Sequence, residues 1–199
     1  MKPVSASVTV IMRSKNAQGT IAQALSALFS QEFKGFELIV VDSGSTDRTL
    51  EIVAQYPGRL IQVEAQSYFP GTILNGAIKE AQGEFVVLQN SDTIPLIPQA
   101  LTHLLSAFDN PKVAAAFARQ VPRPDARIEV RHDYARSFPA SAPAAPWIEL
   151  SLPFAALRRE VWAEHPFYTQ AWASEDTEWG HWAVSHGYEV KYVPEALVM

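Results

Sequence analysis

The chain has 199 residues, 48% of them hydrophobic, and this length and apolar content fit one large domain with a packed core. It contains no cysteine, which excludes disulfide scaffolds, cysteine nucleophiles and thiolate metal sites, so any metal must bind to oxygen or imidazole. The formal net charge of −5 argues against a nucleic-acid-binding surface, which usually carries a basic stripe, and is compatible with a nucleotide bound through a metal.

The N-terminus leads directly into an apolar run, without the charged segment, apolar stretch and small-residue cleavage site of a signal peptide. We therefore expect a cytoplasmic protein. No uninterrupted apolar stretch approaches the roughly 18–20 residues that a membrane span requires, so the sequence predicts no crossing. Peripheral association with the inner face of a membrane stays open at this point.

The first 120 residues alternate short apolar runs with amphipathic segments, a pattern typical of parallel strands joined by crossover helices. Continuous apolar runs suit strands that are covered on both faces. In chain order, the predicted strands are 8–12, 36–41, 60–63, 85–88 and 113–118. The predicted helices are 19–30, 46–55, 74–80 and 103–108. We interpret residues 1–120 as the nucleotide-binding part of a single α/β domain with a mostly parallel, Rossmann-like sheet.

The composition changes after residue 121. Prolines scattered among polar and alanine residues predict an irregular segment over 122–153, on the face that carries the active site. The pattern then predicts helices at 155–164 and 174–187, followed by a final strand at 188–193. An apolar tail follows the last predicted strand, and no further helix or strand closes the domain after it. We therefore expect the acceptor-binding and catalytic part, 121–199, to be truncated at its C-terminus.

The positions that follow each predicted strand are the candidates for chemistry, because ligands of open α/β sheets bind beyond the carboxyl ends of the strands. Asp42 ends an apolar strand and precedes Gly44, which allows a tight turn. Its carboxylate could accept a hydrogen bond from a base or a ribose hydroxyl. The alternative is an Asx-turn that merely ends the strand.

Asp92 occupies the same kind of position after the strand at 85–88. A hard oxygen ligand there could hold Mg²⁺ or Mn²⁺ and bridge it to a diphosphate, which would lower the charge on the leaving group. The alternative is that Asp92 caps the helix announced by Pro95.

Three carboxylates, those of Glu175, Asp176 and Glu178, begin an aromatic-rich predicted helix. Their structural role would be to offset the helix dipole. Their functional role would be that one carboxylate removes a proton from an acceptor hydroxyl while an indole, such as that of Trp172, stacks on a sugar. The spacing alone leaves both roles open.

Six segments resemble, in the same order, the motifs of family 2 glycosyltransferases with the GT-A fold, and the later ones are similar to rhamnosyltransferase-like members. They are VIMRSKN (10–16), IVVDSGSTD (39–47), GTILNGA (71–77), AQGEFVVLQNSD (81–92), RQVPRPDA (119–126) and EDTEW (175–179). The resemblance covers nearly the whole chain. It implies an inverting transfer of a sugar from a nucleotide diphosphate to an acceptor hydroxyl in one displacement.

The resemblance also implies roles for individual residues. Asp42 would bind the nucleoside, Asp92 the divalent metal (Mg²⁺ or Mn²⁺), and Asp176 would be the general base, with Glu175 beside it. Separately from the resemblance, the place of Trp172 just before the acidic run favours a contact with the acceptor. The residues expected to bind the nucleotide-sugar are Arg13, Ser14, Asn16, Asp42, Gly71, Asn75, Asn90, Ser91 and Asp92.

Two positions depart from the family pattern. Asn90 stands where the metal-binding DxD motif commonly begins with an acidic residue, which leaves Asp92 as its only carboxylate. Ile73 stands where related members often carry a basic residue, which removes a diphosphate contact.

These departures motivate an alternative function, a degenerate nucleotide-sugar-binding module without catalysis. A nucleotidyltransferase would need a glycine-rich basic loop near the N-terminus, and a nicotinamide enzyme would need G-x-G-x-x-G after the first strand; neither motif is present. By resemblance we expect a UDP- or dTDP-sugar donor, with rhamnose as the sugar suggested, and a cell-envelope glycan or lipid-linked saccharide as acceptor.

Overall fold

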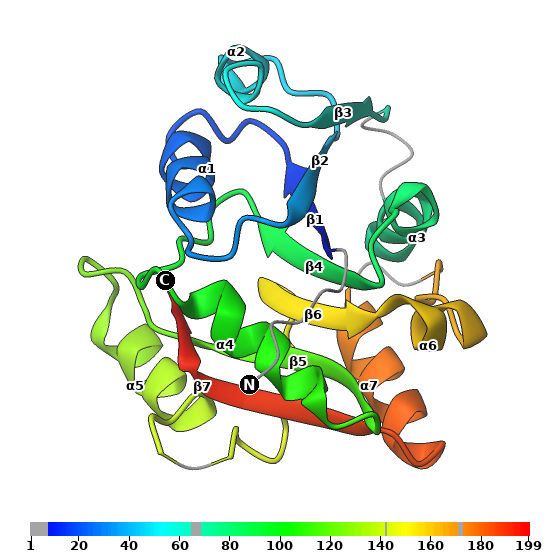
Figure 1. Ribbon diagram of the computed structural model, residues 1–199. Helices are drawn as coiled ribbons and strands as arrows, with labels where there is room; N and C mark the ends of the chain where they lie inside the picture. Colours follow the sequence, from blue (N-terminus) through cyan, green and yellow to red (C-terminus); the bar gives the residue numbers. More distant parts are fainter. Residues whose placement is uncertain (1–7, 65–68, 142, 171–172) are drawn as a thin grey trace.

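The computed structural model describes residues 8–64, 69–141, 143–170 and 173–199, which fold around one seven-stranded sheet with helices on both faces (Figure 1). The strands are β1 (Val8–Ser14), β2 (Phe36–Asp42), β3 (Arg59–Gln62), β4 (Phe85–Asn90), β5 (Val113–Gln120), β6 (Phe154–Arg158) and β7 (Glu189–Val198). The helices are α1 (Ile21–Phe29), α2 (Thr49–Val53), α3 (Pro70–Glu80), α4 (Ala100–Ser106), the 3-10 turn η2 (Ala107–Asp109), α5 (Ile128–Ser137), α6 (Arg159–Glu164) and α7 (Glu175–Ser185).

The sheet order is β3-β2-β1-β4-β6-β5-β7. Strands β1 to β4 are mutually parallel, β7 is parallel to β5, and β6 runs antiparallel between β4 and β5. Because β1, β2 and β4 are neighbours and run in the same direction, the loops that follow them meet at one edge of the sheet.

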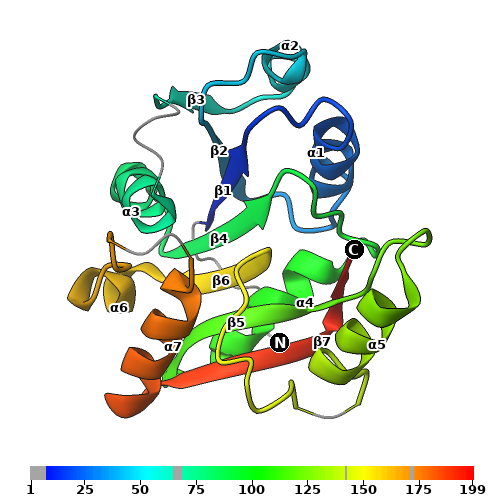
Figure 2. The ribbon, with the colours of Figure 1, turned by 180° about the vertical axis from the view of Figure 1, so that it is seen from behind.

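Strand alternation divides the core into two layers. In β1, Val10 and Met12 face α1 and α4, while Ile11 between them faces α3 and the helices of the second half. Figure 2 shows α3, α6 and α7 along the same side of the sheet. Both faces are therefore covered, which explains the nearly continuous apolar runs of the central strands.

The expected α/β class and the strands and helices of the first 120 residues are confirmed, with shifts at their ends. The single helix predicted at 155–164 is wrong, because Phe154–Arg158 form strand β6 and only Arg159–Glu164 are helical. All five residues of β6 are buried between two neighbouring strands. A short apolar run of this kind does not distinguish a buried strand from a buried helix by its periodicity.

Two further corrections concern the second half. The segment predicted to be irregular contains helix α5, none of whose residues is buried, so it has no apolar stripe that a sequence pattern could reveal. The final strand does not end at 193 but continues to Val198. The apolar tail pairs on both sides: Val121 N donates to Val198 O, and Ile94 and Met199 exchange two backbone hydrogen bonds.

None of the helices in the described ranges has both the length and the apolar character needed to cross a bilayer.

Candidate active site

A cleft of about 710 Å³ opens at the carboxyl ends of β1, β2 and β4. The strand register places Ser14 opposite Asp42 and Arg13 opposite Asn90, so the loops after the three strands converge. The cleft is lined by Arg13, Ser14, Lys15, Asn16, Ala17, Thr20, Ser43, Asn90, Ser91 and Asp92. Six of the residues expected to bind the nucleotide-sugar are thus brought together, namely Arg13, Ser14, Asn16, Asn90, Ser91 and Asp92.

The rim of the cleft is held by hydrogen bonds between the loops after β1 and β2. Asn16 N donates to Ser45 Oγ (2.8 Å), and Asn16 Oδ1 accepts from Thr46 N (2.8 Å). Asn16 has φ of 47°, a left-handed conformation that asparagine tolerates better than most residues. These two hydrogen bonds therefore join the loop after β1 to the loop after β2.

Asp47 adds a second link between these loops, since its carboxylate accepts hydrogen bonds from Gln18 N (3.1 Å) and Thr49 N (3.0 Å). Desolvation raises the pKa of Asp47, but the hydrogen bonds from Thr49 and Gln18 together outweigh it, so the pKa lies below its ordinary value. The carboxylate is thereby kept in the charged form that holds the rim.

Asp42 is fully buried, and its carboxylate serves the turn that follows β2. Oδ1 accepts from Gly44 N (3.1 Å) and Ser45 N (2.8 Å), while Oδ2 accepts from Ser45 Oγ. Gly44 has φ of 80°, which is why glycine is needed there. This is the Asx-turn arrangement; Asp42 shapes the loop, and its neighbour Ser43 lines the cleft instead.

Asp92 lies where the cleft meets a second pocket of about 590 Å³. Its side chain is exposed, and its carbonyl accepts a hydrogen bond from Arg123 Nη2 (2.7 Å). The capping alternative does not hold, because helix α4 is preceded by Gln99 and has no side-chain cap. Asp92 therefore has no structural task for its carboxylate among the contacts that the structure describes.

A divalent metal fits this edge of the cleft only if a bound nucleotide supplies part of its coordination. Within the described ranges no three acidic or histidine side chains cluster closely enough to hold a metal by themselves. Mg²⁺ is commonly held by one or two carboxylates together with substrate phosphates and water. Asp92 suits that arrangement, with the remaining ligands coming from a bound diphosphate.

Helix α7 reaches the cleft through Arg13, which bridges two side chains. Nη1 of Arg13 lies 3.3 Å from Glu175 Oε1, and Nη2 donates to Asn90 Oδ1 (2.9 Å). The side chain of Glu175 is only 8% exposed and that of Arg13 is 19% exposed. Glu175 is therefore held as the partner of a cation.

The three carboxylates at the start of α7 thus have different tasks. Glu178 Oε1 lies 2.8 Å from His165 Nε2, and Glu175 is paired with Arg13. Asp176 is half-buried and accepts hydrogen bonds only from the next residue, Thr177, among the contacts within the described ranges. Of the three, Asp176 is the carboxylate left available to accept a proton from a ligand.

Asn75 and Gly71, two other expected ligand residues, do not line the cleft. Asn75 Nδ2 donates to Phe167 O (2.7 Å), and its Oδ1 accepts from Phe167 N (3.0 Å) and from Trp162 Nε1 (3.2 Å). A Cβ on Gly71 would lie 2.1 Å from Tyr168 O. Both residues instead join α3 to the segment at 165–168.

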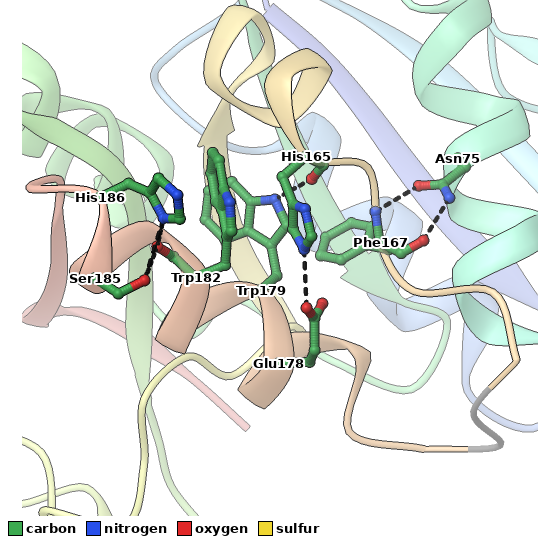
Figure 3. Close-up of polar contacts among 8 residues, drawn as sticks. All are labelled: Asn75, His165, Phe167, Glu178, Trp179, Trp182, Ser185 and His186. Carbon is green, nitrogen blue, oxygen red and sulfur yellow. Dashed lines mark hydrogen bonds and ion pairs between the residues drawn. The ribbon is translucent and has the colours of Figure 1, made fainter.

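The same segment is joined to α7 on its other side (Figure 3). Trp179 Nε1 donates to His165 O (2.8 Å), and the His165 ring stacks on Trp182 with 4.7 Å between centroids. The tryptophans of α7 are therefore packing residues. Trp172, the expected acceptor contact, lies outside the described residues.

The sequence reasoning missed several residues of the two pockets. In the cleft these are Lys15 and Ser43, which directly follow β1 and β2, and Ala17 and Thr20, which lie in the loop between β1 and α1. Lys15 and Ser43 stand inside the motifs at 10–16 and 39–47, which gave them no individual role. The second pocket shares Asn90 and Asp92 with the cleft and is lined further by Gln120, Arg123, Arg127 and Tyr134, among others. Gln120 and Arg123 stand in the motif at 119–126, which gave them no individual role, whereas Arg127 and Tyr134 depend on where α5 lies.

A model of the family described as Glycosyl transferase family 2 matches residues 9–174. The chain belongs to this family. Among curated relatives, it is 27% identical to the O-antigen chain rhamnosyltransferase RfbN of Salmonella typhimurium over 96% of the chain and 65% of RfbN. It is 41% identical to the poly(ribitol-phosphate) β-N-acetylglucosaminyltransferase TarS of Staphylococcus aureus over 42% of the chain and 16% of TarS. The chain thus spans less than two thirds of either relative.

Solved structures agree on the fold. The mannosyltransferase PcManGT of Pyrobaculum calidifontis, in complex with GDP-Man and Mn²⁺, superposes with a TM-score of 0.79 at 24% identity, over 97% of this chain and 56% of that one. Residues 1–349 of S. aureus TarS superpose with a TM-score of 0.76 at 24% identity, over 96% and 59% of the two chains. The expected GT-A fold is confirmed.

Proposed function

We propose that this chain forms the donor-binding and catalytic part of an inverting glycosyltransferase. It would move a sugar from a nucleoside diphosphate to a hydroxyl of a glycan or a lipid-linked saccharide. The observation that carries the proposal is the cleft at the carboxyl ends of β1, β2 and β4, with Asp92 at its edge and the uncommitted carboxylate of Asp176 on the helix that Arg13 joins to it.

The proposed residues act in a single displacement. Asp176 accepts the proton of the acceptor hydroxyl, whose oxygen forms a bond to the anomeric carbon as the bond from that carbon to the diphosphate oxygen breaks. Asp92 would hold Mg²⁺ or Mn²⁺, which supplies positive charge to the departing diphosphate. Asn16, Asp42 and Asp47 keep the loops that form the nucleotide side of the cleft in place.

The relatives support a donor and an acceptor class. One solved neighbour holds GDP-Man and Mn²⁺, and another structure of TarS holds UDP-GlcNAc. RfbN acts on O-antigen chains and TarS on poly(ribitol-phosphate), both by their names. We therefore propose a UDP-, dTDP- or GDP-sugar as donor and a cell-envelope polysaccharide as acceptor. An acceptor linked to a membrane lipid would bring the protein to the inner membrane face.

The test uses the chain and its Asp176→Asn variant with UDP-, dTDP- and GDP-sugars. We expect release of one nucleoside diphosphate in the presence of an acceptor, with inversion at the anomeric carbon seen by NMR. Asp176→Asn should lower the turnover rate about 10²–10⁴-fold while donor affinity is kept. Unchanged turnover in Asp176→Asn would refute the assignment of the base.

Asn90 favours one alternative, a nucleotide-sugar-binding module without catalysis. Such a module would bind the nucleotide-sugar but release no nucleoside diphosphate, and Asp176→Asn would then change nothing measurable. The same assay therefore separates the two functions.

A further inference from the structure

The guanidinium of Arg13, which lines the cleft, has more N–H donors than the hydrogen bonds described for it. A guanidinium carries five N–H donors in a fixed planar fork. Nη1 uses one N–H in its hydrogen bond to Glu175, and Nη2 uses one N–H in its hydrogen bond to Asn90. Within the described part of the chain, no further hydrogen bond of this side chain is recorded, and Arg13 lines the cleft. The remaining donors can bind an anion there.

Glu175 fixes the position of this guanidinium. Its side chain is 8% exposed, and a carboxylate so deeply buried requires a charged or hydrogen-bonding partner. Within the described ranges, Arg13 is the partner recorded for it. An arginine held in this way loses less conformational freedom when it binds a ligand, because its rotamer is already set.

Asn90 leaves the guanidinium available. Its neutral amide accepts one hydrogen bond from Arg13 and contributes no charge. An aspartate at this position would add a second carboxylate beside Arg13 and would place negative charge next to the bound diphosphate. Lys15, which also lines the cleft, adds a second cation, so the charges that face a ligand are Arg13, Lys15 and Asp92.

We propose that Arg13 binds the diphosphate of the donor directly, and that Glu175 and Asn90 are positioning residues that aim its guanidinium. The planar fork of arginine matches two phosphate oxygens, which a point charge on lysine does not. Diphosphate binding in this chain then persists in part without a divalent metal, and a metal at Asp92 adds to it. This inference rests on the proposed donor site and assigns Glu175 a task different from that of the base.

The test measures the dissociation constants of UDP, dTDP and GDP by calorimetry, each with Mn²⁺ and with EDTA. The wild-type chain should bind one of them under both conditions. In EDTA, Arg13→Gln should raise that dissociation constant about tenfold or more, as expected for loss of charge-assisted hydrogen bonds. Arg48→Gln, a matched control at an exposed arginine whose partner is Glu51, should leave it unchanged.

Three further variants separate the contributions. Arg13→Lys keeps the charge but loses the fork, so it should weaken diphosphate binding nearly as much as Arg13→Gln. Glu175→Gln keeps the size and the acceptor atom, and should weaken diphosphate binding in EDTA with no change in the pH dependence of turnover, as expected of a positioning residue. Asn90→Asp should increase the effect of Mn²⁺ on the dissociation constant about fivefold or more.

The outcomes are distinguishable. Binding with Mn²⁺ that vanishes completely in EDTA, or equal binding in EDTA by wild type and Arg13→Gln, overturns this inference and leaves the donor site standing. Absence of binding under both conditions overturns the donor site itself, and this inference with it. If Arg13→Gln fails to fold, as judged by circular dichroism, Arg13→Lys and Glu175→Gln decide the question.

Discussion

Replacing Asn75 by alanine should destabilise the protein without touching donor binding. The change leaves three groups without their partner, namely the N–H and C=O of Phe167 and the indole N–H of Trp162. The three hydrogen bonds are buried, and each group left unpaired costs about 1–3 kcal/mol. Allowing for local relaxation, we expect a loss of about 3–5 kcal/mol in the free energy of unfolding.

Urea denaturation followed by tryptophan fluorescence measures this loss, and calorimetry with the nucleotide that binds measures the effect on the site. Asn110→Ala is the matched control, because Asn110 is exposed and its side chain contacts only Glu189 and the Lys112 backbone among the described contacts. The control should change stability by about 1 kcal/mol or less. A variant Asn75→Ala that stays within about 1 kcal/mol of wild type and loses donor affinity would refute the reasoning.

Two further predictions follow from packing and burial. Gly71→Ala should lower the free energy of unfolding by at least about 2 kcal/mol, because its Cβ would lie 2.1 Å from Tyr168 O. Gly76→Ala on the same helix, where an added Cβ would meet nothing within 4 Å, should raise the free energy of unfolding by about 0.5–1 kcal/mol. Thermal melts compare the two variants, and equal melting temperatures would contradict the prediction. Burial raises the pKa of Tyr192 from its ordinary value of 10.0 to about 12, outweighing the opposing charge of Arg119. The unfolded chain then loses this proton first, so stability should fall as pH rises from about 10 to about 12, and Tyr192→Phe should flatten that fall in urea melts at each pH; an unchanged slope would contradict it.

The sequence predicted the first half of the fold well, for a physical reason. Strands β1, β2 and β4 are covered on both faces, so their residues form continuous apolar runs between polar loops. Helix α5 has no buried residue, so no buried apolar stripe marks it in the sequence. Strand β6 is followed directly by helix α6, so the segment predicted as one helix at 155–164 contains both a strand and a helix. Neither could be inferred from periodicity.

The sequence predicted which candidate residues meet at the ends of the strands, and it did not predict the contacts that depend on packing between distant segments. Arg13 and Asn90 lie within the last two residues of β1 and β4, and Asp92 lies just beyond β4, so their convergence was foreseeable. The partner of Asn75 is Phe167, which lies 92 residues away in the sequence, and the partner of Arg13 is Glu175, which lies 162 away. Such pairings arise from the tertiary fold and leave no local signal.

The central claim is that the cleft at the ends of β1, β2 and β4 binds a nucleoside diphosphate with Asp92 as its metal ligand. Calorimetric titration of UDP, dTDP and GDP into the chain and into Asp92→Ala, each with Mn²⁺ and with EDTA, tests it most directly. We predict that one nucleotide binds, that Mn²⁺ tightens its binding, and that Asp92→Ala abolishes the tightening. Absence of binding by all three nucleotides under both conditions would contradict the account.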